Sequence, residues 1–160
     1  MIDADASPCG YIAWYNHHSR SSRIRAVRPV PKNEKFGVQR MEMLAIYFAL
    51  TDNLRNIKRK TSKHRKGRII IAVRSDSKST VEQLLGLCQI RDTMMRRIFF
   101  AIANLLAKIR QVITFSHLQR SHNIAGLLLE QRKMNEGKWK MRDNFNMLPA
   151  IMPAMSSYIL

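Results

Sequence analysis

Asp3 and Asp5, close to the start of the chain, are the first residues whose types and spacing could do chemistry. They are two positions apart, so in an extended segment both side chains project from the same face. Two clustered carboxylates on so basic a chain require an explanation, and carboxylate oxygens are the ligands that hard divalent cations prefer. The segment is therefore a candidate metal-binding site.

Two later carboxylates have simpler explanations when each is taken alone. Glu42 lies beside the apolar residues of an expected helix, where a surface side chain is the favoured interpretation. Asp76 directly follows an expected strand, a place where metal ligands often lie in α/β folds. An Asp there can equally hold the turn by accepting hydrogen bonds from backbone amides. Neither residue identifies a site by itself.

The charge of the chain indicates its class of partner. Lys and Arg number 28 against 11 Asp and Glu, which gives a net charge of +17 and a pI near 10.8. Such an excess favours a polyanion, either nucleic acid or an anionic membrane surface. The charge is spread through the chain and not gathered on one amphipathic helix, so we expect nucleic acid and no membrane partner. The residues from 55 to 68 include eight Lys or Arg and no acid, and as a loop or frayed helix end they could bind phosphates. A solvated charged run or a localisation signal is the alternative interpretation.

The cysteines and the apolar runs bear on the compartment. Cys9 and Cys88 form no metal-ligand pair by spacing, which favours a reducing environment. No signal segment opens the sequence, and no apolar run reaches the roughly 18 residues that span a bilayer. We expect a cytoplasmic protein, or a nuclear one if the source is eukaryotic.

Apolar patterning predicts the elements that must position the carboxylates. The opening strand is expected to continue to Tyr15, with Ser7 to Gly10 as a bulge or tight turn within it. Further strands are expected at 23–30, near 34–38, at 69–73 with both faces buried, and at 112–116. Helices are expected at 38–57, from a Ser-x-x-Glu capping box at Ser79, at 91–109, and after the loop that follows the last strand.

This order predicts an α/β fold with a mixed five-stranded sheet, in which three antiparallel hairpin strands are joined by parallel strands and flanked by helices. We expect one domain over 1–134, with the basic segment 55–68 inserted as a loop. Residues 135–160 form a C-terminal extension whose end is apolar and broken by prolines. It would pack on the domain, associate with another copy, or dock on a partner.

Four segments in this order resemble motifs of the RNase H family, in particular type 1 RNases H and the RNase H domains of reverse transcriptases. The segments are DASPCGYIAW, QRMEMLAIYFAL, RSDSKSTVEQL and HLQRSHNIAGLL. The resemblance implies an RNase H-like fold and maps catalytic, metal-binding carboxylates to Asp5, Glu42 and Asp76. Gly126 stands where the family has a fourth aspartate, and Glu130, one turn further along the same helix face, or His122 could replace it.

The resemblance also implies a chemistry. Two Mg²⁺ or Mn²⁺ ions would be bridged by Asp5 and completed by Glu42 and Asp76, with His117 or His122 assisting proton transfer or product departure. Asp3 would be a supporting or alternative ligand. The substrate would be an RNA–DNA hybrid, whose RNA strand is cut internally to leave a 3′-hydroxyl and a 5′-phosphate. The expected nucleic-acid contacts are Lys58, Arg59, Lys60, Arg65, Lys66 and Asn123.

Two other functions stay open at this point. One is an RNase H-like binding module that cleaves weakly or not at all, because it lacks a carboxylate at Gly126. The other is a relative that acts on DNA, such as a resolvase or an integrase-like enzyme, since the fold does not choose the substrate.

Overall fold

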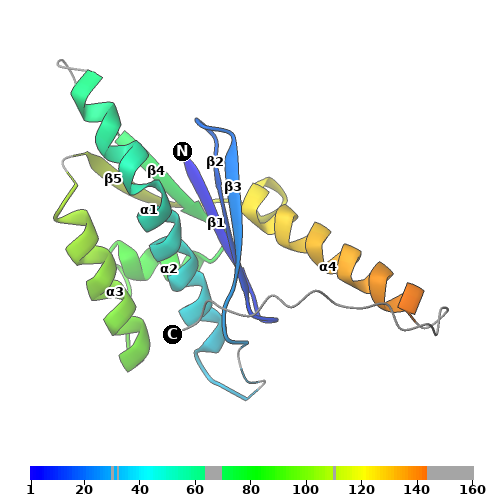
Figure 1. Ribbon diagram of the computed structural model, residues 1–160. Coiled ribbons are helices and arrows are strands. Elements are labelled where there is room, and N and C mark those ends of the chain that lie inside the picture. Colours follow the sequence, from blue (N-terminus) through cyan, green and yellow to red (C-terminus); the bar gives the residue numbers. More distant parts are fainter. Residues whose placement is uncertain (30, 32, 64–69, 110, 144–160) are drawn as a thin grey trace, which may run out of the picture.

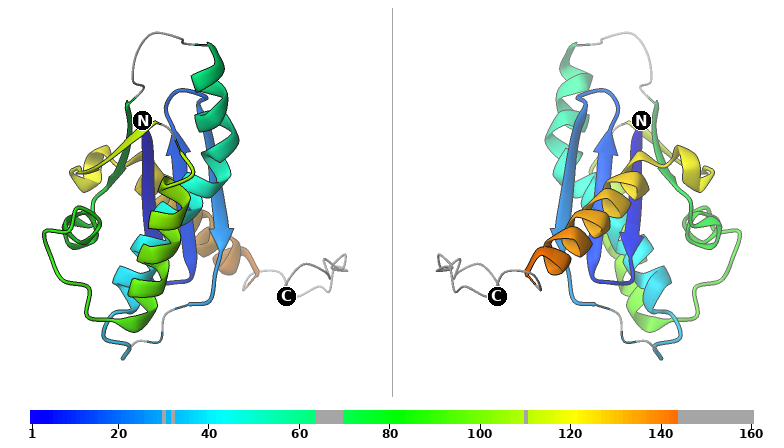
Figure 2. Two further views of the ribbon diagram at one scale, coloured as in Figure 1. Left: turned by 90° about the vertical axis from the view of Figure 1, so that its left-hand side faces the viewer. Right: turned by 90° about the vertical axis from the view of Figure 1, so that its right-hand side faces the viewer.

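The computed structural model describes residues 1–29, 31, 33–63, 70–109 and 111–143, with the backbone alone for 58–63 and 136–143. Its elements are β1 (Ile2–Ser7), β2 (Tyr11–Asn16), β3 (Ser21–Ala26), α1 (Gly37–Lys63), β4 (Ile70–Ser75), α2 (Lys78–Leu84), α3 (Thr93–Leu106), β5 (Val112–His117), the short 3-10 helix η1 (Arg120–His122) and α4 (Ile124–Asp143). One sheet forms the middle layer, with α1 and α3 on one face and α4 across the other (Figures 1 and 2).

The sheet has the strand order β3-β2-β1-β4-β5. The first three strands pair antiparallel, whereas β4 pairs parallel with both β1 and β5. The predicted mixed five-stranded sheet is therefore confirmed. This order places β1 at the centre, between the antiparallel half and the parallel half, and so brings its aspartates next to the end of β4.

The first hairpin differs from the expected bulge within one long strand. Pro8, Cys9 and Gly10 reverse the chain, and β1 pairs with β2 from Ile2 opposite Asn16 to Ser7 opposite Tyr11. The backbone N–H of Gly10 donates to the carbonyl of Ser7 over 3.0 Å. The φ of Gly10 is 90°, a left-handed conformation that a residue without Cβ adopts at low cost. Three hairpin strands therefore fit before position 27, ahead of the expected places.

The expected strand near 34–38 is accordingly wrong, since α1 already begins at Gly37. The helix also extends beyond its expected end, as far as Lys63. The first part of the basic segment 55–68 is thus helical and not a loop. The side chains of Lys58, Arg59 and Lys60, and the whole of Arg65 and Lys66, lie outside the described residues.

The two following helices begin at other residues than predicted. The Ser79 capping box is wrong, because α2 starts at Lys78 with Ser77 as its N-cap. The Ser77 hydroxyl bonds the Thr80 hydroxyl over 2.8 Å. In α3, which was expected from 91, Asp92 is the N-cap and its carboxylate accepts from the backbone N–H of Met95 over 2.8 Å.

The main core lies between the sheet and the α1–α3 layer. Its largest fully buried apolar side chains are Ile2, Ile12, Met43, Ile46, Leu50, Val73, Met95 and Ile102. A smaller cluster joins Ala13 of β2 to Ala125 and Leu129 of α4. Among the described elements α4 contacts β1, β2 and β3, and Ile70, the first residue of β4, is 66% exposed. The expectation that β4 is buried on both faces is therefore wrong for its first residue.

The last helix runs across position 134, where the sequence predicts the domain to end, and continues to Asp143. The apolar C-terminal residues 144–160 lie outside the described part of the chain. Within the described ranges, no helix combines the length and apolar character needed to cross a membrane.

Candidate metal centre

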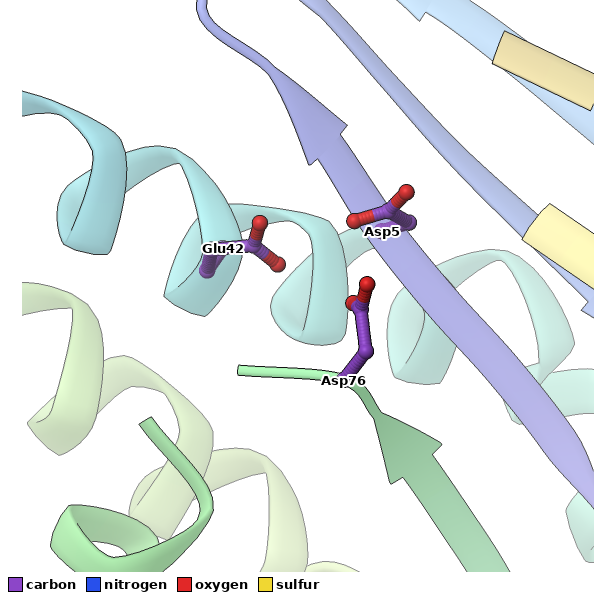
Figure 3. A group of neighbouring side chains, drawn as sticks. All are labelled: Asp5, Glu42 and Asp76. Carbon is purple, nitrogen blue, oxygen red and sulfur yellow. The ribbon is translucent and has the colours of Figure 1, made fainter. Parts of the chain in front are cut away.

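Three carboxylates from distant parts of the sequence point toward one another beside the central strand of the sheet (Figure 3). Asp5 comes from β1, Glu42 from the start of α1, and Asp76 directly follows β4. One oxygen of each lies within 4.8 Å of one oxygen of the others. The structure thus brings together the three residues that the family resemblance selects.

The parallel pairing of β1 with β4 explains this convergence. Ile2 lies opposite Val73 and Asp3 opposite Arg74, so β1 extends beyond the end of β4 and Asp76 falls beside Asp5. Packing of α1 on β1 brings Glu42 to the same point and leaves it only 8% exposed. The surface interpretation of Glu42 from the local pattern alone is therefore wrong. Helix periodicity placed it beside the apolar stripe, and tertiary packing buried it.

Burial makes ionisation of these groups costly. Asp5 is 1% exposed, and desolvation, reinforced by the charge of Asp76, raises its pKa from 3.8 to about 7. Desolvation, together with the charges of Asp5 and Asp76, raises the pKa of Glu42 well above its usual value of 4.5. Three acids that repel one another in a dry site are stabilised by a cation placed between them.

The oxygens of Asp5 also fit a cation. Among the residues that the structure describes, Oδ1 of Asp5 is buried and has no hydrogen-bond partner. A buried carboxylate oxygen without a donor is costly. Hard oxygen ligands such as these suit Mg²⁺ or Mn²⁺. The donor set and the unsatisfied oxygen therefore both fit a divalent metal, held by Asp5, Glu42 and Asp76.

Asn123 is a buried residue that holds Asp76 in position. Its side chain is fully buried, and Nδ2 donates to Oδ1 of Asp76 over 3.1 Å and to the carbonyl of Ala4 over 3.2 Å. The sequence predicts a nucleic-acid contact for this residue. The structure instead places it beneath the carboxylates, where it fixes Asp76 against β1, and leaves it no exposed surface for a ligand.

Arg120 is a residue of the site that the sequence reasoning missed. In η1 its guanidinium lies 3.5 Å from Oδ2 of Asp76 and 3.1 Å from Oε1 of Glu130. The hydrogen bond to Glu130 is the main reason that the pKa of Arg120 is raised. Glu130, expected as a substitute ligand, is 51% exposed and pairs with Arg120 instead of joining the carboxylate group. Only its position within the matched loop could have indicated Arg120.

The two candidate histidines differ in their contacts with the segments that carry the carboxylates. His117 ends β5, and its Nε2 donates to the carbonyl of Asp76 over 3.2 Å. His122 is exposed in η1. His117 is thus attached to the backbone of a carboxylate-bearing segment, whereas no such contact with the described residues places His122 at the centre.

Asp3 has a structural role separate from that of Asp5. It is fully buried, and its carboxylate accepts from Nε of Arg74 over 2.7 Å and bonds Nε2 of His17 over 2.8 Å. It also accepts from the backbone N–H of Ile124 over 3.4 Å. These contacts tie β1, β4 and the start of α4 together, and they occupy the oxygens that a metal would need.

Comparisons with known proteins support the fold. The sequence matches no protein-family model and no curated protein. The structure is similar to RNase H1 of the halophilic archaeon Halobacterium salinarum, with a TM-score of 0.59, 17% identity, and coverage of 78% of this chain and 88% of that one. It is also similar to LC11-RNase H1 in complex with an RNA/DNA hybrid, with a TM-score of 0.57, 19% identity, and coverage of 76% and 86%.

A third solved structure is the N-terminal RNase H domain of Rv2228c from Mycobacterium tuberculosis. It gives a TM-score of 0.54 at 18% identity and covers 77% of this chain and 82% of that one. At these identities the likeness concerns architecture, and the chain has the RNase H fold.

Proposed function

We propose that this chain, which has the RNase H fold, is a metal-dependent endonuclease that hydrolyses the RNA strand of RNA–DNA hybrids. The observation that carries the proposal is the group of Asp5, Glu42 and Asp76, with oxygens within 4.8 Å of one another. It lies on a chain with a net charge of +17, and an unsatisfied buried oxygen points to a cation. The products would be a 3′-hydroxyl and a 5′-phosphate.

Each residue of the site has a role that follows from its contacts. A divalent cation on the carboxylates would activate water and neutralise charge that develops at phosphorus. Asn123 and the backbone bond from His117 hold Asp76 in place. Since Nε2 of His117 donates to a carbonyl, Nδ1 is the ring nitrogen that would be left to accept a proton. The side chain of Arg120 is 67% exposed and offers donors to a phosphate.

The proposed partner is the RNA–DNA hybrid. LC11-RNase H1, which has a similar fold, was solved with such a hybrid. The basic charge of this chain favours binding to a phosphate backbone, and an A-like duplex is recognised largely by its shape and 2′-hydroxyls. The resemblance implies two metal ions in the family, but the ligand set of this chain differs from the family's at Gly126.

An end-labelled hybrid tests the proposal directly. Cleavage is measured in Mg²⁺ and in Mn²⁺, with single-stranded RNA and duplex DNA as alternative substrates. The Asp76→Asn variant keeps the size of the side chain and removes a ligand charge. We expect internal cuts in the RNA strand of the hybrid alone, and a loss of at least about 100-fold in rate in the variant. Equal cutting by the variant would contradict the assigned site.

The absence of a carboxylate at Gly126 favours one other function, a hybrid-binding module without turnover. Tight binding of the hybrid with no cleavage in either metal would select that function. Cleavage of branched or duplex DNA in preference to the hybrid would instead place the chain with DNA-acting relatives.

A further inference from the structure

Gly126 is the position at which this centre differs from the family pattern, and the carboxylate of Asp5 lies directly beside it. A Cβ atom added at Gly126 would lie 2.6 Å from Oδ2 of Asp5 and 3.5 Å from its Cγ. Carbon and oxygen atoms that are not bonded do not approach so closely without displacement. The carboxylate of Asp5 therefore fills the space from which a fourth ligand at position 126 would project.

A positive charge also lies beside the carboxylate group. Arg120 lies between Oδ2 of Asp76 and Oε1 of Glu130, at 3.5 Å and 3.1 Å. Glu130 is the acid nearest to Gly126 along α4, and its carboxylate accepts hydrogen bonds from the guanidinium of Arg120. Within the described ranges, the metal-binding group consists of three carboxylates.

We infer that this centre holds a single divalent cation between Asp5, Glu42 and Asp76, and that Arg120 supplies the positive charge beside Asp76 that a second cation would otherwise provide. The inference rests on the proposed function. It is supported by Oδ1 of Asp5, a buried and unpartnered oxygen in a side chain that is 1% exposed.

The ligands limit the number of ions. Asp5, Glu42 and Asp76 are the three carboxylates of the group within the described ranges, and Glu130, a fourth acid nearby, is paired with Arg120. In a buried site an ion without carboxylate ligands of its own is costly, so a second ion would need a ligand that this arrangement lacks.

The first test counts the ions. Binding of Mn²⁺ to the full chain is measured by the paramagnetic resonance signal of the free ion, and the single-turnover cleavage rate is measured against Mg²⁺ concentration. We expect one tight Mn²⁺ per chain and a Hill coefficient near one. Two tight ions per chain, or a Hill coefficient near two, would overturn the inference and leave the proposed function standing. No bound Mn²⁺ would contradict both.

The second test adds a side chain at Gly126. In Gly126→Ala the new methyl group forces Asp5 to turn, and we expect Mn²⁺ affinity to fall about 10- to 100-fold. Gly126→Asp should show the same loss and should not gain a second ion. Leu127→Ala, at an exposed neighbour in α4, is the matched control and should bind as the natural chain does. A second tight ion in Gly126→Asp would overturn the inference.

The third test removes the charge of Arg120. In Arg120→Gln a cation at the carboxylates no longer faces a nearby guanidinium, so Mn²⁺ should bind at least about threefold more tightly. The single-turnover rate should fall, because the positive charge beside Asp76 is removed. Tighter binding together with slower cleavage separates this role from a merely structural one. Weaker Mn²⁺ binding, or an unchanged rate, would contradict it.

Discussion

Asn123 and Asp76 are 47 positions apart in sequence, yet Nδ2 of Asn123 lies 3.1 Å from Oδ1 of Asp76. The same nitrogen donates to the carbonyl of Ala4, next to Asp5. One buried amide thus joins the segments that carry two of the three carboxylates. Since groups that orient metal ligands govern metal affinity almost as strongly as the ligands do, Asn123 should be essential to the centre.

Replacing Asn123 tests this relationship. Asn123→Ala leaves the carbonyl of Ala4 and Asp76 without their donor, and we expect a loss of about 1–3 kcal/mol in the free energy of unfolding. Mn²⁺ affinity should fall about 10- to 100-fold. Asn53→Ala is the control, because Asn53 is equally buried but bonds Asn16 and the carbonyl of Ala49. Equal losses of Mn²⁺ affinity in the two variants would show that Asn123 has no special role.

Metal-free stability should depend on pH through Asp5. The pKa of Asp5 is about 7 in the folded chain against 3.8 ordinarily, so the folded state binds this proton more tightly than the unfolded state does. Its contribution to stability is fully present below about pH 4 and is lost as pH rises through about 7. We therefore expect Tm without metal to fall between pH 5 and pH 8. Asp5→Asn should flatten this fall, and an unchanged slope in that variant would assign the dependence to other groups.

A bound divalent metal should offset the loss of stability that ionisation of the carboxylates causes at high pH. At pH 8 the carboxylates are ionised and repel one another, so millimolar Mg²⁺ should raise Tm more at pH 8 than at pH 5. The comparison is made by thermal unfolding with and without a chelator. A shift that is absent at both pH values, or larger at pH 5, would contradict the proposed site.

The bond between Arg40 and Asp92 should stabilise the fold without affecting the metal. Nε and Nη2 of Arg40 donate to the carboxylate of Asp92 over 2.9 Å and 2.6 Å, and this pair lowers the pKa of Asp92 to about 2. Asp92→Ala removes both the bidentate pair and the N-cap of α3. We expect the free energy of unfolding to fall by about 2–3 kcal/mol. Asp92→Asn keeps a capping oxygen and should lose less. Equal losses in denaturant unfolding would show that the cap contributes little.

The basic segment should contribute to hybrid binding through phosphates. We predict that neutralising Lys58, Arg59, Lys60, Arg65 and Lys66 flattens the dependence of log K on log salt by up to about 0.9 for each phosphate that the variant no longer neutralises. Neutralising the exposed Arg96 and Arg97 of α3 measures the effect of removing charge elsewhere. A slope that changes equally per charge in both variants would show that the segment has no preferred role in binding phosphates.

The local pattern was least informative about side chains whose environment comes from distant segments. Glu42 reads as a surface residue on its helix, and only the packing of α1 against β1 buries it. Likewise, nothing near Glu130 in the sequence shows that Arg120 reaches it from η1. The strand positions were also displaced, because the chain reverses direction before Tyr11 and forms two paired strands, where one continuous strand to Tyr15 was expected.

The sequence by itself determined the order of elements, the mixed sheet, the basic character and, through short motifs, the carboxylates of Asp5, Glu42 and Asp76. These follow from apolar periodicity and from residue types, which act over a few neighbouring positions. Only the tertiary structure decided that Asn123 supports Asp76, that Arg120 pairs with Glu130, and that Asp5 fills the space at Gly126. Those relationships depend on how segments far apart in the chain pack to within a few ångströms, and no local pattern encodes such distances.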